Sequence, residues 1–405
     1  MKENSKNNQL RELYDNVMLP NYSPASFIPE RAEGSRLWDK DNKEYIDFGG
    51  GIAVNSLGHS HPDLIEALAV QSKKLWHLSN YLTNQPAIEL AERLTKNTFA
   101  ENVFFSNSGS EANETAIKIA RKFFSTKGEK RDQIVSFKNS FHGRSLLNIS
   151  LGSSKVHRNG FEPLMPGIAH GNFNELKGLE TLINKNTAAV IVEPVQGEAG
   201  VYEATIDFLK KIREVTSENE VLLIIDEVQS GVGRTGSLYS YMNYDIAPDI
   251  LTSAKGLGGG IPIGATLTTE AIGKSMQPGT HGSTYGGNPL GCAVAIETIK
   301  HILKPEFLCT IRRKGDFFKE RLHGLLEMFP EQILDVRGRG LMLGLKCVSK
   351  NVHLIDMCRR EKLLLVPGAS NTVRILPPLT ITYKEIKEAI IRLERALLEM
   401  RKFNE

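Results

Sequence analysis

The chain has 405 residues, of which 40% are hydrophobic and 24% charged, and a formal net charge of +3. This composition excludes a disordered or fibrous protein, and the length predicts two domains, because single cores usually stop growing beyond about 250 to 300 residues. Basic residues have acidic neighbours along the chain, so we expect no nucleic-acid partner. With no bilayer-length apolar run, no secretory signal and four scattered cysteines, we expect a soluble, cytoplasmic protein without membrane contact.

The predicted elements begin with a polar surface helix or tail to about residue 16, followed by the extended stretch LPNYSPASFIP. WDKDNKEYIDF predicts a hairpin, because Asp41 and Asn42 offer turn chemistry between two strand-like pieces. From about residue 64, helical segments alternate with the apolar strands ENVFFS, QIVSF, AAVIVEP and VLLIIDE, which predicts a wound α/β sheet. From about residue 289, long amphipathic helices around GLMLGLK and TVRILPP predict a second, smaller domain.

Lys255 is the only charged residue in ILTSAKGLGGGIPIGATLTT, at 250–269. A lysine usually lies on the solvated surface. Small and apolar neighbours predict at least partial desolvation here, which lowers the pKa of an amine. Lys255 is therefore a candidate for forming an imine.

Asp226 ends the apolar run VLLIID, as expected of a buried strand that opens into a crevice. A carboxylate at that place can keep a pyridine nitrogen protonated and so make the ring an electron sink. Capping of a helix is the alternative role. Lys255 follows 255 − 226 = 29 residues later, which leaves room for one loop and another strand to bring both into one pocket.

The segment from Ser108 to Ser110 stands between a strand and a strongly helical segment, where backbone N–H groups would face an anion such as a phosphate. A capping box from Ser108 to Glu111 is compatible with that role. Phe141 and Arg144, in FHGR, suit stacking on a cofactor ring and a forked contact to a carboxylate. Arg374 lies in an apolar strand-like context and should need a carboxylate partner or a ligand.

Two further patterns have alternative interpretations. Gly231 to Gly236 matches GxGxxG, and Asp249 lies near the spacing of a ribose-binding acid, but SLYSYMNYDIAPD follows instead of a good helix. We therefore interpret this match, and with it a nicotinamide-binding function, as a coincidence. His59 and His61 resemble paired metal ligands, but no cysteine or acidic cluster completes them, so we expect structural histidines and no metal.

Taken together, the motifs closely resemble those of the class III pyridoxal-phosphate-dependent aminotransferases, and within them the acetylornithine and succinylornithine aminotransferases. The resemblance runs through PNYSPASFIPERAEGSRLWD, YIDFGGGIAVNSLGHSHP, NSGSEANE, FHGR, VEPVQGEAGV, IIDEVQSGVGRTG, SAKGLGGGIPIGA, GSTYGGNPLGCAVA and RILPPL. It implies the transferase fold of type I: a mostly parallel seven-stranded sheet flanked by helices, plus a smaller α+β domain. The expected large domain is 61–288, and the small domain combines 1–60 with 289–405.

The resemblance also implies a role for each candidate residue. Lys255 would carry pyridoxal phosphate as a Schiff base and move protons, while Asp226 would hold the ring nitrogen. Further cofactor contacts would be Ser108, Gly109 and Ser110 at the phosphate, Phe141 and Val228 on the two ring faces, Gln229 at the ring hydroxyl and Thr284 at the phosphate of the neighbouring subunit. Substrate contacts would be Tyr22 and Arg144 at the carboxylated end of the ornithine derivative, Ser283 nearby, Arg374 at the 2-oxoglutarate carboxylate and Glu198, which would neutralise Arg374 in the other half-reaction.

The implied activity is transfer of the terminal amine of N2-acetylornithine or N2-succinylornithine to 2-oxoglutarate, in arginine metabolism, by a homodimer with shared active sites. Departures from the commonest family pattern at Ala32, Ser110, Ser145 and Ala199 remove no catalytic group. Ala199 also occurs in ornithine enzymes of the class and leaves the acyl group open. Alternatives within the class are ornithine, succinyl-diaminopimelate, 4-aminobutyrate or an internal amine shift; a cofactor-binding protein without turnover is the alternative outside it.

Overall fold

The structure is a computed structural model and describes residues 6–404. Its largest element is a seven-stranded sheet in the order β4-β12-β11-β10-β7-β5-β6. The strands are β4 (Asn102–Ser106), β12 (Gly264–Thr268), β11 (Ile250–Ser253), β10 (Leu222–Asp226), β7 (Thr187–Val192), β5 (Gln133–Phe137) and β6 (Ile168–Gly171). Strands β11 to β6 are parallel, whereas β12 runs antiparallel to both of its neighbours. The predicted mostly parallel seven-stranded sheet is confirmed.

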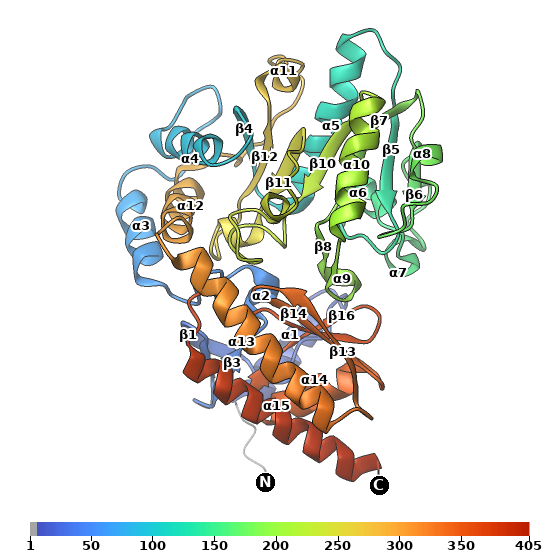
Figure 1. Ribbon diagram of the computed structural model, residues 1–405. Helices are drawn as coiled ribbons and strands as arrows, with labels where there is room; N and C mark the ends of the chain where they lie inside the picture. Colours follow the sequence, from blue (N-terminus) through green and yellow to red (C-terminus); the bar gives the residue numbers. More distant parts are fainter. Residues whose placement is uncertain (1–5, 405) are drawn as a thin grey trace.

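Helices cover both faces of this sheet, with α5 (Gly109–Thr126) and α10 (Ile206–Glu218) on opposite sides (Figure 1). The side chains of β10 alternate accordingly: Leu223 and Ile225 join the core cluster that contains Phe208 of α10, whereas Ile224 joins the cluster of α5. Because both faces are covered, the strand is a continuous apolar run rather than an alternating one. That is why VLLIID could be recognised in the sequence.

The lower part of the molecule in Figure 1 combines the two ends of the chain in two smaller sheets. One contains β1 (Pro29–Glu33), β2 (Arg36–Asp39), β3 (Glu44–Asp47) and β15 (Leu363–Leu364); the other contains β13 (Ile333–Arg339), β14 (Met342–Cys347), β17 (Thr372–Ile375) and β16 (Val366–Gly368). Strands β2 and β3 form the predicted hairpin, and Asn42 in its turn has φ of 58°. Parallel pairing of β3 with β15 joins the N-terminal and C-terminal segments in one sheet.

Long helices complete this lower part, as the amphipathic pattern predicts. They are α13 (Phe307–Met328), α14 (Asn351–Arg360) and α15 (Tyr383–Asn404), while α12 (Pro289–Ile302) packs instead against α3 (Pro62–Ser72) and α4 (Gln85–Lys96). The remaining elements are short: α2 (Gly50–Ala53), α6 (Leu146–Leu151), α7 (Lys155–Arg158), β8 (Val195–Gln196), α8 (Leu179–Leu182), α9 (Gly197–Gly200), β9 (Tyr202–Glu203), α11 (Glu270–Gly273) and the 3-10 turns η1 (Ser240–Asn243) and η2 (Lys255–Leu257). The domain boundaries given above stay predictions.

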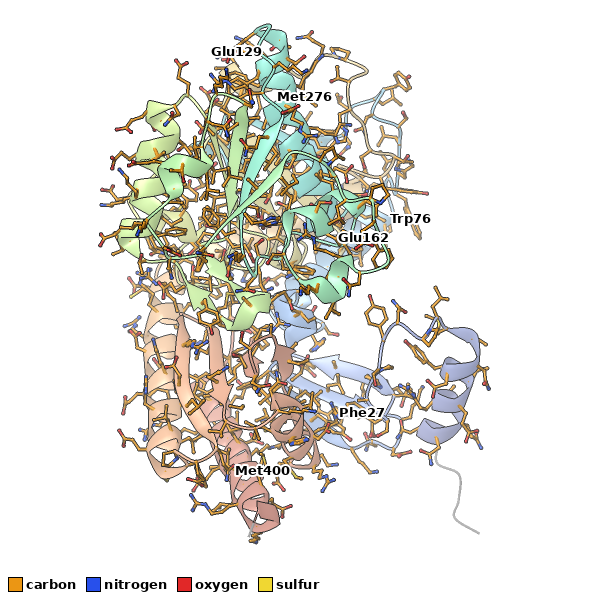
Figure 2. All side chains as sticks on the ribbon, turned by 90° about the vertical axis from the view of Figure 1, so that its right-hand side faces the viewer. Phe27, Trp76, Glu129, Glu162, Met276 and Met400 are labelled. Carbon is orange, nitrogen blue, oxygen red and sulfur yellow. The ribbon has the colours of Figure 1, made fainter. Side chains whose placement is uncertain are left out.

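The polar start of the chain forms helix α1 (Lys6–Val17), and the first five residues of that predicted segment lie outside the described residues. Figure 2 shows this end standing out to one side, with Phe27 between it and the sheet. The Phe27 ring stacks on Tyr45 of β3 at a centroid distance of 4.3 Å. Among residues 6–404, no helix is long and apolar enough to cross a membrane.

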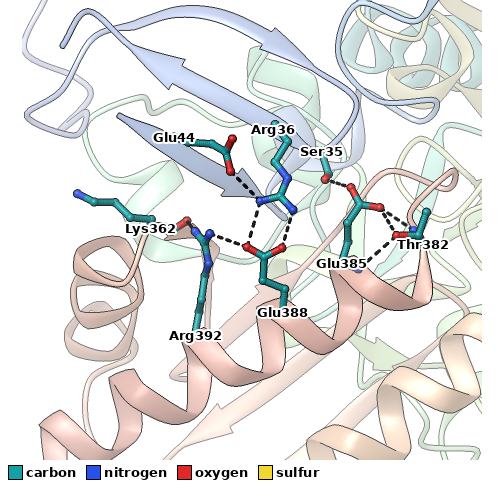
Figure 3. A network of polar contacts seen from close by, with 8 residues as sticks. All are labelled: Ser35, Arg36, Glu44, Lys362, Thr382, Glu385, Glu388 and Arg392. Atoms are coloured by element: carbon teal, nitrogen blue, oxygen red, sulfur yellow. Dashed lines mark hydrogen bonds and ion pairs between the residues drawn. The ribbon is translucent and has the colours of Figure 1, made fainter. Parts of the chain in front are cut away.

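A polar network fixes helix α15 on the N-terminal sheet (Figure 3). The Arg36 guanidinium of β2 makes a forked contact to the Glu388 carboxylate, at 2.5 and 3.1 Å, and a third bond to Glu44 at 2.8 Å. Arg392 bonds the same Glu388 carboxylate from the next turn of the helix, at 2.6 Å. Planar, forked pairing of this kind fixes orientation as well as charge. The network therefore sets how the last helix lies on the first sheet.

Candidate active site

A cavity of about 420 Å³ opens at one edge of the large sheet. The segments around it follow the carboxyl ends of β4, β5, β7, β10 and β11, the edge where ligands of wound sheets bind. Nine predicted site residues line it: Ser108, Gly109, Ser110, Phe141, Arg144, Asp226, Val228, Gln229 and Lys255. The fold therefore gathers residues that lie up to 255 − 108 = 147 positions apart in the sequence.

Lys255 follows β11 and begins the turn η2 in the wall of the cavity. Burial lowers the pKa of its amine, as predicted, although the carboxylates of Glu198 and Asp226 act in the opposite direction. Its backbone φ is 42°, a left-handed conformation that residues other than glycine seldom adopt. Such conformations persist where the surrounding structure enforces them, often at functional sites. The turn therefore presents an amine that is deprotonated more easily than an exposed lysine.

Asp226 is held in one orientation by bonds to both carboxylate oxygens. Its Oδ2 atom accepts from Asn113 Nδ2 and lies next to His142 Nδ1, each at 2.7 Å, and its Oδ1 atom accepts the Val228 N–H at 2.9 Å. Thr252 in turn donates to the Asn113 side-chain oxygen at 2.7 Å. No helix follows Asp226, so the alternative of a helix cap is not what the structure shows. The carboxylate is positioned toward the cavity instead.

The segment from Ser108 to Ser110 forms the N-terminus of the 18-residue helix α5 and lines the cavity. Ser108 caps the helix as predicted: its Oγ accepts the N–H of Glu111 at 3.2 Å. The Glu111 carboxylate accepts the N–H of Asn107 at 2.5 Å, one residue before the N–H that a standard capping box uses. A Cβ added to Gly109 would lie 2.5 Å from Cγ1 of Val228, so only glycine leaves the approach to this helix end open. A phosphate fits here, because free N–H groups and the helix dipole both favour an anion.

Phe141 and Val228, the two residues expected on the faces of a flat cofactor, both line the cavity. The Phe141 backbone N–H donates to Glu193 Oε2 at 3.0 Å, which fixes the loop that carries the ring. The Arg144 guanidinium carbon lies 5.5 Å from the centre of the Phe141 ring, within cation–π range. Arg144 is exposed at the mouth of the cavity, where a substrate carboxylate can reach it.

Arg374, on β17, has the carboxylate partner that its apolar surroundings predict. Only 2% of Arg374 is exposed, and its Nη1 lies 2.6 Å from Glu198 Oε1. The same nitrogen lies 3.4 Å from Oε1 of Gln229, which lines the cavity. Two further bonds, at 3.1 and 2.8 Å, tie the guanidinium to the Pro367 carbonyl. The ion pair of Arg374 and Glu198 thus lies directly behind the cavity wall, and Gln229 separates it from the cavity.

Besides Glu198 and Arg374, three more predicted residues are not in the wall of this single-chain cavity. Tyr22 is 73% exposed, and Thr284 is also exposed. Ser283 accepts a hydrogen bond from Asn107 Nδ2 at 3.2 Å, and Asn107 does line the cavity. Ser283 is therefore adjacent to the site, whereas the roles of Tyr22 and Thr284 stay predictions.

Sequence reasoning missed four residues of this site: Asn113, His142 and Thr252, which position Asp226, and Glu193. Glu193 follows β7, is 6% exposed and lines the cavity. Burial, and secondly the charge of Asp226, raise its pKa well above the usual value, so its carboxyl group keeps a proton to higher pH. Its signal was available, because it ends the run AAVIVE as Asp226 ends VLLIID. His142 lies within FHGR, but nothing in the sequence indicates that it contacts Asp226.

The other two patterns resolve as structural features. Gly231 to Gly236 forms consecutive turns, which are followed by the short 3-10 turn η1 and not by an α-helix, so the nicotinamide alternative finds no support in the fold. His59 Nε2 lies 2.7 Å from Asp47 Oδ2, and its Nδ1 lies 3.3 Å from the Asn55 amide. His59 therefore connects the end of β3 to the segment after α2, as expected of a structural histidine.

Comparisons with known proteins agree with the motifs. The model of the family "Aminotransferase class-III" matches residues 17–397. The chain is 47% identical over 396 residues to an acetylornithine aminotransferase of Pseudomonas putida, and the match covers 96% of this chain and 97% of the relative. It is 49% identical over 387 residues to a succinylornithine transaminase of Salmonella agona, and this match covers 94% of this chain and 95% of the relative. The ornithine aminotransferase of Toxoplasma gondii, solved with pyridoxal phosphate in its active site, superposes with a TM-score of 0.94 at 31% identity, covering 99% and 96%.

Proposed function

The chain belongs to the class-III aminotransferases, which are pyridoxal-phosphate-dependent, and we propose that it moves the terminal amine of an N2-acylornithine to 2-oxoglutarate. N2-acetylornithine, or N2-succinylornithine, would give the corresponding semialdehyde and glutamate, within arginine metabolism. One observation carries this proposal: relatives named for these two donors match nearly the whole chain at 47% and 49% identity. The absence of membrane-spanning helices among residues 6–404 and four free cysteines support a place in the cytoplasm.

The residues of the cavity fit pyridoxal phosphate. The N-terminus of α5 would hold its phosphate, Asp226 its ring nitrogen, and Lys255 its carbonyl carbon. When bound, the group supplies an electron sink for negative charge that develops on the substrate carbon. Lys255 Nζ, with its lowered pKa, would then take and return the proton at that carbon.

Two arginines divide the recognition of carboxylates in this proposal. Arg144 at the cavity mouth would bind the carboxylate of the acylornithine, with Tyr22 beside it. Arg374 is neutralised by Glu198 at 2.6 Å, and it would bind the second carboxylate of 2-oxoglutarate when Glu198 moves away. Both arginines favour a dicarboxylate acceptor over an internal amine shift.

We further propose a homodimer in which each subunit completes the site of the other. Thr284 and Tyr22 lie outside the single-chain cavity, which is expected if they serve a neighbouring site. The connection between α3 and α4 exposes large apolar side chains: 65% of Trp76, 98% of Tyr81 and 65% of Leu82 are exposed. Trp76 points away from the body in Figure 2. Exposed apolar side chains that gather in this way mark an interface.

The test of donor class is a half-reaction panel on the purified enzyme. Acetylornithine, succinylornithine, ornithine and 4-aminobutyrate are each added without acceptor, and conversion of the bound cofactor is followed by its absorption. Rapid conversion by an acylornithine supports the proposal. Ornithine is the second candidate, because the Toxoplasma gondii ornithine enzyme superposes with a TM-score of 0.94, and fastest conversion by ornithine would transfer the assignment to it.

The test of shared sites mixes two inactive or weakened variants, Lys255→Ala and Thr284→Ala, by unfolding or subunit exchange. If Thr284 serves the neighbouring site, half of the dimers regain one intact site, and activity returns to about one quarter of the parent value. If Thr284 acts within its own subunit, mixing restores nothing. Lys274→Ala, which changes a lysine whose side chain is 71% exposed, is the control and keeps full activity.

A further inference from the structure

Two histidines and an aspartate from distant parts of the chain meet beside helix α3, away from the cavity described above. His61 immediately precedes α3, Asp63 lies in its first turn, and His301 lies in the last turn of α12. One potential ligand atom from each lies within 4.8 Å of the other two. The two imidazole rings meet edge to face, with their centroids 4.7 Å apart. The sequence could not show this group, because His301 stands 301 − 61 = 240 positions after His61.

His61 has a buried ring nitrogen, Nδ1, without a hydrogen-bond partner among residues 6–404. Buried polar atoms in proteins nearly always have a partner, so this atom is available to a water, a ligand or an ion. Burial lowers the pKa of the His61 ring, and the neighbouring His301 lowers it further.

His301 and Asp63 form the other half of the group. His301 Nε2 bonds to Asp63 Oδ2, and Lys304 Nζ lies 3.0 Å from His301 Nδ1. An ammonium group can only donate, so Nδ1 accepts from Lys304 and Nε2 carries the proton that is shared with Asp63. The Asp63 side chain is 54% exposed and free to adjust, whereas that of His301 is 12% exposed and held by its helix.

We propose that His61, Asp63 and His301 form a binding site for a divalent transition-metal ion of the zinc type. Two imidazoles and a carboxylate are ligands that such an ion prefers, with water completing the shell. Donors around a tetrahedral Zn²⁺ lie about 3.4 Å apart, so the exposed Asp63 carboxylate must rotate out of its short bond to His301 Nε2 to admit the ion. The widest pair of ligand atoms, within 4.8 Å, must approach by up to about 1.4 Å. The ion would displace the proton of His301 Nε2 into solvent.

A bound ion would clamp the start of α3 to the end of α12. These helices already pack against each other, and α12 also packs against the turn η2 that begins with Lys255. The clamp would thus stabilise the support beneath the active-site lysine without entering the cavity. This proposal departs from the expectation of no metal, which rested on the pair His59 and His61 and on the lack of an acidic residue beside them. In the structure His59 bonds Asp47 instead, and Asp63 supplies the acidic ligand beside His61.

The experiment is calorimetric titration of the chelator-treated holoenzyme with Zn²⁺, alongside His301→Ala, Asp63→Asn, Lys304→Met and the control His353→Ala, which removes an exposed histidine elsewhere. We expect about one ion per chain, with affinity at least tenfold weaker in His301→Ala and Asp63→Asn and unchanged in the control. Lys304→Met should bind several-fold more tightly, because it removes a positive charge beside the site.

A second readout separates a metal site from a merely structural cluster. Zn²⁺ should raise the melting temperature of the parent and of His353→Ala, but not that of His301→Ala. Melting curves and cofactor content without metal show that each variant is folded. Equal Zn²⁺ affinity in the parent, His301→Ala and Asp63→Asn would mean adventitious binding only and would overturn the proposal, as would the absence of any saturable binding by the parent.

Discussion

Gly109 is the residue whose substitution tests the cofactor cradle most directly. A Cβ at this position would lie 2.5 Å from Cγ1, 2.9 Å from Cγ2 and 3.3 Å from Cβ of Val228. Rotation of the Val228 side chain about χ1 does not move the Val228 Cβ, so the contact between this atom and the added Cβ remains. The end of helix α5 and Val228 must therefore separate. Overpacking of this kind costs about 1 to 3 kcal/mol, and because the strain falls on two cofactor-binding residues, Gly109→Ala should weaken cofactor binding by about 5-fold to 150-fold.

The assay is equilibrium dialysis of the apoenzyme against pyridoxal phosphate, with the melting temperature measured in parallel. Gly324→Ala is the matched control, because Gly324 lies within α13 and a Cβ added there meets none of the described atoms within 4 Å. This control should bind the cofactor like the parent and gain stability from the better helix former. If Gly109→Ala binds as tightly as Gly324→Ala, the steric account of the cradle is wrong.

Two predictions concern stability and pH. Burial raises the pKa of Glu227 to about 7, so folding takes up a proton and wild-type stability falls as pH rises from about 4.5 to 7. Glu227→Gln keeps neutral partners for Ser230 and Tyr241 and should be more stable than the parent by up to about 3 kcal/mol above pH 7. If the melting temperatures of variant and parent differ by the same amount at pH 5 and at pH 8.5, this account is contradicted. The bond from Arg36 lowers the pKa of Glu388, so this carboxylate stabilises the fold above its unfolded pKa and loses that effect as pH falls through the folded pKa. Glu388→Gln should therefore lower the free energy of unfolding by less than about 1 kcal/mol at pH 7 and leave it unchanged in acid. A loss of stability that persists in acid would refute the ion pair as its cause.

Much of the large sheet could be predicted from the sequence, because covered strands are short apolar runs between helical segments. The runs around Val103, Val135, Ile191 and Ile224 all became strands. The strand order could not be predicted. β12 inserts antiparallel between β4 and β11, although β4 precedes it by more than 150 positions, and only packing across the folded sheet determines that place.

The same distinction applies to the site. Asp226 could be found because it ends an apolar strand, and Lys255 because it is the only charged residue in the segment that follows another strand. Both signals are local, since they depend only on neighbours in the sequence. Asn113 and His142 could not be assigned, because their bonds to Asp226 span 113 and 84 positions and depend on how α5 and the β5 loop meet β10. The proposed role of Thr284 needs a second subunit, which a single chain cannot display.

The charges of the cavity fit the proposal that one site accepts two different substrates in turn. Glu198 and Arg374 compensate each other at 2.6 Å, and burial, with the charge of Asp226, raises the pKa of Glu193. Asp226 would balance a protonated cofactor ring. In the proposed reaction, the α-carboxylate of the donor would be bound at Arg144 while the inner pair stays closed. A dicarboxylate acceptor would bring a negative charge to Arg374, which would replace Glu198 there without leaving an uncompensated buried charge, provided that Glu198 regains water. Gln229, which contacts both members of the pair, is placed to guide this exchange.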